Sequence, residues 1–260
     1  MNTVRSGIHW LFSELRYALT ALAYFTRIPV PRWVGYEAHY LNAAARYFPL
    51  IGLLVGAVAA GAYWLALHLW TPPIAVLLSM AATLLLTGAF HEDGLADSMD
   101  AFGGGYTRED TLRIMHDSRI GTFGTVALLV VLALKWQALV ALPPPLAVVA
   151  MVAAHGTSRL FAIAYLRTLP YVRPEGKAKP VASELHGVAL AMAVVCGGAP
   201  LLGLPWPLAL AIPLALLPLW FWLGRYFRRR LGGYTGDCLG MAQQLAELAI
   251  LLMAAAWMSF

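Results

Sequence analysis

Charged side chains are scarce in this sequence. Asp, Glu, Lys and Arg make up 12% of the 260 residues, whereas hydrophobic residues make up 60%. A soluble domain carries about 25% charged residues, so this composition excludes an ordinary soluble globular protein. The net charge of +5 is modest, and the basic residues do not alternate with exposed aromatics, which argues against nucleic acid as a partner. We predict an all-α polytopic membrane protein in contact with lipid, with residues 1–260 forming a single helical domain.

Other common features are also missing. The two cysteines lie apart, Cys196 in an apolar run and Cys238 in a glycine-rich loop, so no disulfide framework is indicated. Glu14 and Arg16 interrupt the first apolar segment, which does not fit a cleaved signal peptide. There is no convincing internal repeat.

The first 45 residues are predicted to form an N-terminal interfacial segment. Residues 8–30 place apolar side chains at helical spacing, with Glu14, Arg16 and Arg27 among them. This pattern is typical of an amphipathic helix on the membrane surface, although an irregular first span is an alternative. Pro29 and Pro31 then end the helix.

Apolar runs of about the 20 residues needed to cross a bilayer follow. We expect about seven spans, at residues 48–70, 73–90, 122–142, 146–166, 188–204, 207–223 and 239–260. In the first of them, Gly52 and Gly56 form a small-xxx-small pair, which predicts close packing on a neighbouring helix within the chain or between chains.

The connections between these runs alternate in charge. Three of them, at residues 71–72, 143–145 and 205–206, carry no charge, and the others are basic. The basic connections contain Arg108, Arg113, Arg119, Arg167, Arg173, Lys177, Lys179, Arg225, Arg228, Arg229 and Arg230. Basic loops favour the cytoplasmic side, so we expect a bacterial inner-membrane protein with its charged face toward the cytoplasm. Lys135 is the exception and is expected either to snorkel or to face the bundle interior.

Residues 91–121 form an acidic segment between two apolar runs. The stretch holds seven of the 13 acidic residues: Glu92, Asp93, Asp97, Asp100, Glu109, Asp110 and Asp117. If the second span continues as a helix through Asp100, then Asp93, Asp97 and Asp100 share one face, and Glu92 points about 100° away. Like charges on one stripe repel unless a hard cation binds between them, and oxygen ligands suit Mg²⁺. A solvated acidic helix end without a ligand is the alternative.

Glycines and an arginine follow the acidic helix. The triplet at residues 103–105, with Gly104 at its centre, is expected to end the helix and to let the backbone approach a ligand. Thr107 and Asp110 resemble a capping box for a new helix. After it, Ser118 and Arg119 are candidates for phosphate binding, because an arginine fork matches phosphate oxygens. Arg119 as a simple positive-inside anchor is the alternative.

Two further polar sets are predicted at the same membrane face. Arg46 precedes the first span, and Arg159 lies inside the fourth run near His155 and Ser158. An arginine inside a span is a functional candidate, unless it pairs with a buried carboxylate for structural reasons. A glycine-rich loop at residues 232–237, containing Thr235, Gly236 and Asp237, precedes the last span. Carboxylates, arginines and glycine loops together favour Mg²⁺-assisted handling of a diphosphate.

Several of these segments, in the same order, resemble a known family. They are TRIPVP (26–31), RYFPLIGLLVG (46–56), HEDGLADSMD (91–100), MHDSRIGTFG (115–124), SR (158–159) and GGYTGDCLG (232–240). They resemble the adenosylcobinamide-GDP ribazoletransferases, also called cobalamin synthases. The resemblance covers residues from about 26 to the C-terminus. It departs from the family pattern at Ala101-Phe102, where a glycine is common, and at His116, where a basic residue is common.

The resemblance implies an inner-membrane enzyme of late cobalamin biosynthesis. It would join adenosylcobinamide-GDP to α-ribazole or its 5′-phosphate and release GMP, with Mg²⁺ as cofactor. A homo-oligomer and an association with other enzymes of the pathway both remain open. The site residues that we assign are, for catalysis, Asp97, His91 and Arg119; for substrate or phosphate, Arg46, Ser118, Arg119, Arg159, Gly104, Thr235 and Gly236; and for the metal, Asp93, Asp97, Asp100 and Asp237.

Two other functions are weighed against this one. A membrane alcohol phosphotransferase with CDP-linked donors also uses spaced aspartates and Mg²⁺, but the D-x-x-D-G-x-x-A-R spacing typical of that family is absent from this sequence. A cation-coupled secondary transporter would place its carboxylates near the bilayer midplane, often within inverted repeats. The expected position of the carboxylates at one membrane face favours the enzyme.

Overall fold

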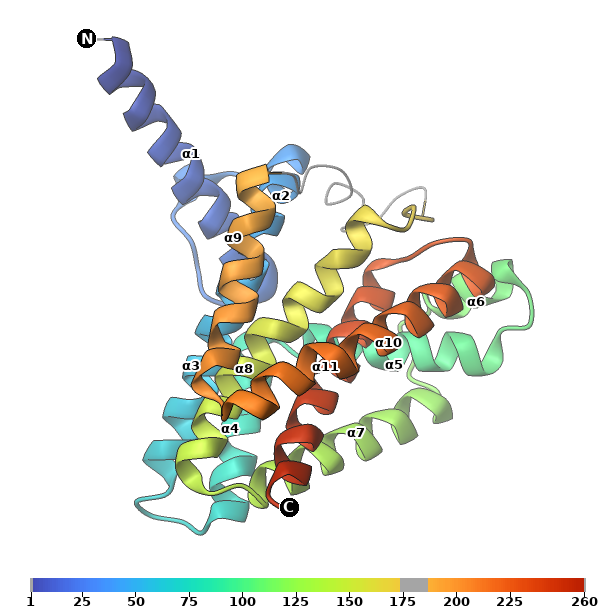
Figure 1. The fold of residues 1–260 in the computed structure, drawn as a ribbon. Helices are drawn as coiled ribbons and strands as arrows, with labels where there is room; N and C mark the ends of the chain where they lie inside the picture. Colours follow the sequence, from blue (N-terminus) through green and yellow to red (C-terminus); the bar gives the residue numbers. More distant parts are fainter. Residues whose placement is uncertain (1, 174–186, 260) are drawn as a thin grey trace.

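The structure is a computed structural model that describes residues 2–173 and 187–259, and in these ranges it is helical (Figure 1). The longer helices are α1 (Asn2–Phe25), α3 (Phe48–Ala66), α4 (Pro72–Thr87), α5 (Phe90–Gly104), α7 (Thr122–Val140), α8 (Pro144–Ile163), α9 (Gly187–Gly198), α10 (Trp206–Leu231) and α11 (Gly236–Trp257). Shorter elements are α2 (Ala38–Ala44), α6 (Arg108–Ile114), η1 (Arg32–Val34), η2 (Ala45–Tyr47), η3 (Ala164–Arg167) and η5 (Ala199–Gly203).

The predicted class, a helical multi-pass membrane protein, is confirmed. Among the described residues, five helices are long and apolar enough to cross a membrane, and a sixth span results if the bent pair α4–α5 is counted as one. The five are His39–Ala66, Thr122–Val140, Pro144–Arg167, Trp206–Leu231 and Gly236–Trp257. The count of about seven spans stays a prediction. The predicted fifth span corresponds to the shorter apolar stretch Gly187–Gly203, which directly follows the residues that the structure does not describe.

The chain turns sharply between α4 and α5. Gly88 and Ala89 both have left-handed backbone conformations, with φ of 67° and 57°, and the two helix axes differ by 88°. Glycine adopts this conformation without strain, and it commonly ends helices. The helix of the second span therefore does not continue straight through Asp100, which was the condition for the shared face of the three aspartates. Asp93, Asp97 and Asp100 still share one helix, because α5 restarts at Phe90.

The helix α10 is longer than its apolar run. The predicted span ended at residue 223, whereas the helix continues to Leu231 and carries Arg228, Arg229 and Arg230 in its last turn. Basic side chains in a last turn interact favourably with the helix dipole. Two internal prolines, Pro213 and Pro218, are accommodated within this helix.

The connections lie at two ends of the bundle (Figure 1). The α3–α4 and α7–α8 connections are at the bottom of the view, whereas α6 and the α10–α11 connection are at the opposite end. This arrangement agrees with the predicted alternation of uncharged and basic connections. Lys177 and Lys179, which belong to one of the predicted basic connections, lie outside the described residues.

The helix α1 agrees with the predicted amphipathic helix at the N-terminus, and polar contacts join its middle to η2, directly before α3. Glu14 accepts hydrogen bonds from Arg46 Nη1 at 3.1 Å and from the Tyr47 hydroxyl at 2.6 Å. The guanidinium of Arg46 also lies 5.7 Å from the ring centre of Tyr17. Arg46 therefore holds α1 against the start of α3.

The pair Gly52 and Gly56 makes the close packing that was predicted, and it does so within the chain. A Cβ atom on Gly56 would lie 2.7 Å from the Cα of Val152, and one on Gly52 would lie 3.0 Å from the Cα of Gly156. Both neighbours are on α8. The small residues thus let α3 and α8 touch backbone to backbone at the centre of the bundle.

Candidate active site

The carboxylates predicted to bind metal lie along α5. Asp93 is exposed, and Asp97 and Asp100 are half-buried. Their spacing puts all three on one side of this helix, which we call the aspartate face (Asp93, Asp97 and Asp100). Asp93 and Asp97 are one turn apart, so their negative charges repel each other across a short distance.

Asp100 is already engaged by the backbone. Its two oxygens accept hydrogen bonds from the N–H groups of Gly121, at 2.7 Å, and Gly124, at 2.8 Å. These N–H groups belong to the first turn of α7, where the helix dipole favours a negative charge. A side chain on Gly124 would collide with Asp100 and with the carbonyl of Ala96, so glycine is needed there. Asp100 therefore fastens the loop that carries Arg119 to α5.

Asp237 comes close to the aspartate face from another helix. The backbones of α5 and α11 meet at Gly94 and Gly240, where a Cβ on Gly94 would lie 3.1 Å from the Asp237 carbonyl oxygen. Asp237 lies in the first turn of α11, and Thr235 caps that helix by accepting from the N–H of Cys238 at 3.2 Å. Thr235 is fully buried, so it serves the helix start and is not open to a substrate.

Arg173 neutralises Asp237. Its Nη2 lies 2.7 Å from Asp237 Oδ2, and the same nitrogen donates to the Met115 carbonyl at 3.1 Å. The pair is positioned by backbone hydrogen bonds between the two loops, from Tyr234 N to the Pro170 carbonyl at 2.9 Å and from Val172 N to the Tyr234 carbonyl at 3.1 Å. Sequence reasoning treated Arg173 only as a loop charge. No local spacing signals this pair, because its members are 64 positions apart in the sequence.

Arg119 faces solvent and binds its own neighbour. Its side chain is 87% exposed and forms a fork on Asp117, with Nη2 2.7 Å from Oδ2 and Nε 3.0 Å from Oδ1. These hydrogen bonds lower the pKa of Asp117 from 3.8 to about 2. Ser118, between them, is also exposed. The loop therefore presents a guanidinium and a hydroxyl to the solution beside the C-terminal part of α5.

His91 points away from the aspartate face. It is two positions before Asp93, a separation of about 200° around the helix, and it is buried with its ring stacked on Phe25 at 5.2 Å. A small cavity of about 40 Å³ adjoins it, bordered also by Arg159 and Gly236. The structure therefore does not bring His91 together with the predicted metal ligands, whereas Gly236 directly precedes Asp237 in the first turn of α11.

The remaining predicted residues are dispersed. Arg159 is 2% exposed and donates to the His155 carbonyl at 2.8 Å. Arg46 is bound by Glu14, as described above, and belongs to the attachment of α1. Gly104 is the exposed last residue of α5, whose end is held by Arg230 through hydrogen bonds to the carbonyls of Phe102 and Gly105 at 3.1 and 2.6 Å. Of the predicted substrate- or phosphate-binding residues, Gly104, Ser118 and Arg119 are thus the exposed ones.

The donor set of the site suits Mg²⁺, although it does not form a complete cage. Within residues 2–173 and 187–259, no group of three or more His, Cys, Asp or Glu side chains is arranged to hold a metal. Mg²⁺ is usually held by one or two carboxylates together with waters and substrate phosphates. Asp93 and Asp97 supply two carboxylates of this kind. Both oxygens of Asp100 accept from backbone N–H groups, and Oδ2 of Asp237 pairs with Arg173.

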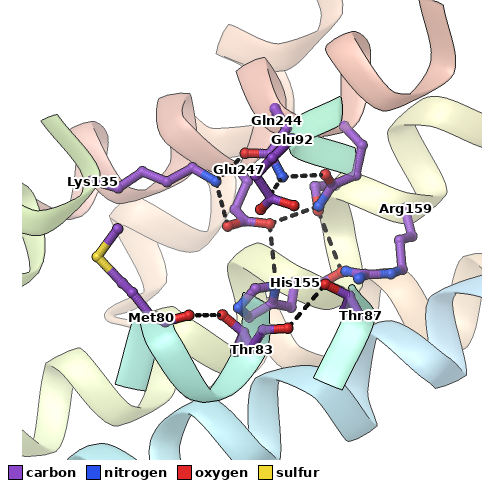
Figure 2. A network of polar contacts seen from close by, with 11 residues as sticks. Met80, Thr83, Thr87, Glu92, Lys135, His155, Arg159, Gln244 and Glu247 are labelled. Atoms are coloured by element: carbon purple, nitrogen blue, oxygen red, sulfur yellow. Dashed lines mark hydrogen bonds and ion pairs between the residues drawn. The ribbon is translucent and has the colours of Figure 1, made fainter. Parts of the chain in front are cut away.

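Sequence reasoning missed a second polar group inside the bundle (Figure 2). We call it the interior network: Glu92, Lys135, His155, Gln243, Gln244 and Glu247. Lys135 binds Glu247 at 2.7 Å, which confirms that it faces the bundle interior. A signal was present in the sequence, because Glu247 stands inside the last apolar run, where a carboxylate is costly without a partner.

Comparison with known proteins assigns the chain to a family. The family model described as cobalamin-5-phosphate synthase matches residues 17–255. A protein of Ralstonia pickettii (strain 12J), named adenosylcobinamide-GDP ribazoletransferase, is 57% identical to the chain, and the alignment covers 100% of both. Proteins of the same name from Ralstonia nicotianae and Shewanella frigidimarina are 58% and 46% identical, over 92% and 95% of this chain and 94% and 96% of theirs.

No solved structure matches the chain. The family match spans the aspartate face, the Arg119 loop and the glycine-rich loop before α11, so the segments that carry the sequence resemblance all lie within it. The chain is therefore an enzyme of the cobalamin-5-phosphate synthase family.

Proposed function

We propose that the chain joins adenosylcobinamide-GDP to α-ribazole, or to its 5′-phosphate, and releases GMP in a Mg²⁺-dependent reaction. The names of its relatives support the substrates. The observation that carries the proposal is the meeting of α5 with the first turn of α11, where Asp93 and Asp97 stand beside Asp237 and Arg173.

Asp93 and Asp97 would hold Mg²⁺, which when bound supplies positive charge against the diphosphate. Asp237 would join them only after its pairing with Arg173 is exchanged for a new partner. Arg173, once released, is a guanidinium placed at the diphosphate, where it can donate two parallel hydrogen bonds to phosphate oxygens. Arg119 and Ser118 extend the same binding surface from the loop that Asp100 fastens.

The acceptor is a ribose hydroxyl of α-ribazole. Its oxygen forms a bond to the phosphorus on the cobinamide side of the diphosphate, and the bond from that phosphorus to the bridging oxygen breaks as GMP leaves. The hydroxyl proton passes to a carboxylate, for which the geometry favours Asp97 over His91, because His91 is on the opposite face of α5. Arg119 stabilises negative charge on the transferred group.

The membrane setting belongs to the same proposal. The basic connections and the aspartate face lie toward one end of the bundle, and basic segments favour the cytoplasmic side. We place the protein in a bacterial inner membrane with this end toward the cytoplasm, where nucleotide substrates are available.

The test is GMP release by the purified protein in lipid nanodiscs. We expect release only when adenosylcobinamide-GDP, α-ribazole and Mg²⁺ are all present, and none after chelation with EDTA. Comparable activity with CDP-linked lipid donors would favour an alcohol phosphotransferase. Ion-coupled uptake into proteoliposomes without GMP release would favour a transporter.

A further inference from the structure

The interior network joins four helices within the apolar bundle (Figure 2). Lys135 on α7 donates to Glu247 at 2.7 Å and to Gln244 at 2.5 Å, both on α11. His155 on α8 lies 3.1 Å from the second oxygen of Glu247, and Gln243 donates to that same oxygen at 2.6 Å. The carboxylate of Glu247 is thereby contacted from three sides.

One branch of this network reaches α5. Gln244 accepts from Lys135 through its carbonyl oxygen and donates through its Nε2 to Glu92 Oε1 at 3.0 Å. The other carboxylate oxygen of Glu92 is buried and, among the described residues, has no hydrogen-bond partner. The side chain of Glu92 is therefore held mainly by its hydrogen bond to Gln244.

A contribution to stability alone does not explain why the bundle contains the interior network. Charged side chains inside a membrane segment are expensive, and a buried ion pair is often no more stabilising than apolar residues of similar size. Directed hydrogen bonds, in contrast, fix one relative position of two helices, whereas an apolar contact tolerates several. The network thus fits a role in setting the position of a helix.

The helix positioned in this way is the one that carries the aspartates. Glu92 directly precedes Asp93 on α5, and Gln244 is two turns beyond Asp237 on α11. At their crossing, α5 and α11 touch through Gly94 and Gly240, which have no side chains to interlock. The Gln244–Glu92 hydrogen bond is then a directed side-chain contact between α5 and α11 beside this crossing.

We propose that Glu92 and Gln244 are positioning residues, which hold the aspartate face in register with Asp237. Neither is required as a ligand or a base. A small cavity of about 30 Å³ borders Glu92, Lys135, His155 and Glu247, so the packing around Glu92 is not complete. The kinetic consequence rests on the proposed function, whereas the structural consequence does not.

The first experiment compares Gln244→Ala with the unmodified protein in nanodiscs. We expect faster amide hydrogen exchange confined to α5, as measured by mass spectrometry. We also expect about a tenfold rise in the Mg²⁺ concentration needed for half-maximal GMP release, as is common when residues supporting a metal site are changed. The KM for α-ribazole should stay unchanged.

Thr157→Val is the matched control. Thr157 donates a buried interhelical hydrogen bond to the Gly197 carbonyl at 2.6 Å, far from α5 in the sequence. This variant should lower the unfolding temperature without altering exchange in α5 or the Mg²⁺ requirement. If it changed them as much as Gln244→Ala does, a general loss of stability would explain the effect and the proposal would fail.

The second experiment separates position from charge at Glu92. In Glu92→Gln the amide oxygen still accepts a hydrogen bond from Gln244. The amide hydrogen exchange of α5 should therefore stay unchanged, and the enzyme should keep most of its turnover. Glu92→Ala should reproduce Gln244→Ala, and the double variant Glu92→Ala/Gln244→Ala should be no worse than either alone. Equal damage from Glu92→Gln and Glu92→Ala would show that the charge matters and would overturn the proposal.

Measuring both hydrogen exchange in α5 and GMP release also separates this inference from the proposed reaction. If exchange in α5 rises in Gln244→Ala but no variant releases GMP, the positioning role stands and the reaction is wrong. If GMP is released normally and α5 exchange does not respond to Gln244→Ala, the positioning role is wrong and the reaction stands.

Discussion

The aspartate face and the interior network differ in how far their charged side chains are exposed to solvent and how they are paired. At the aspartate face, Asp93 is exposed, and nearby Asp117 and Arg119 pair within three residues of one another in solvent. In the interior network, Lys135 and Glu247 are about 95% buried and 112 positions apart. Exposed charges remain free to meet a ligand and contribute little to stability. Buried charges are costly to leave unpaired. We therefore expect changes at the face to affect turnover and changes at the buried pair Lys135–Glu247 to affect folding.

The largest effect is expected from Lys135→Met. It leaves Glu247 buried without its cationic partner, and we expect a loss of about 3 kcal/mol in the free energy of unfolding. Thermal unfolding in nanodiscs is the measurement. The double variant Lys135→Met/Glu247→Gln removes both charges and should recover most of the loss. If the double variant were as unstable as the single one, the ion pair would not be the cause.

Asp97→Asn should affect turnover and leave stability unchanged. Loss of a proposed metal-binding carboxylate is expected to lower GMP release about 100-fold, which corresponds to about 2.7 kcal/mol in the activation barrier. The unfolding temperature should stay the same. Glu109→Gln, an exposed carboxylate of α6 in the same acidic segment, is the control and should stay fully active. Near-normal turnover of Asp97→Asn would remove Asp97 from the site.

Arg119→Ala should have a smaller effect. We expect turnover to fall about tenfold, because a hydrogen bond from a charged group contributes about 1.5–3 kcal/mol. Arg119→Lys should not restore it, since lysine lacks the planar fork. Arg108→Ala, at an exposed arginine of α6, serves as the control. A change in protein yield without a change in turnover would make Arg119 a topological anchor.

The smallest effect concerns pH. The Arg119 hydrogen bonds lower the pKa of Asp117 from 3.8 to about 2 in the folded protein. The stabilisation from this pair is therefore complete above about pH 5 and is lost as the pH falls through 2. Carboxyl NMR of labelled aspartate should give Asp117 a titration midpoint near 2. A midpoint near the ordinary aspartate value of 3.8 would contradict the pairing.

The sequence predicts features that depend on spacing within one segment, and it misses contacts between distant segments. The shared face of Asp93, Asp97 and Asp100 follows from spacing within one helix, and the Thr107 cap of α6 is confirmed, with its hydroxyl accepting from Asp110 N at 3.0 Å. The partners of Asp237 and Glu247 come from distant segments, and no periodicity brings them together. The bend before α5 was missed because Gly88 was read as part of a span, although glycine commonly ends a helix.

There is also a physical reason why some of the predicted site residues lie away from the aspartate face. Arg46, Arg159 and His91 are close in the sequence to apolar runs, and each is used for packing: Arg46 with Glu14, Arg159 with the His155 carbonyl, and His91 with the ring of Phe25. A polar group inside a membrane segment must find a partner. The sequence shows that need, but it does not show whether the partner is the protein itself or a substrate.

The turn at Gly88 and Ala89 also determines where the aspartate face lies relative to the rest of the bundle. A straight helix over residues 72–104 would be about 50 Å long, well beyond a hydrocarbon layer of about 30 Å, and its far end would stand alone in water. Because the chain instead folds over at a right angle, its carboxylates stay level with the rim of the bundle. If the proposed function holds, its two substrates would be joined at this rim and not at the tip of a projecting helix.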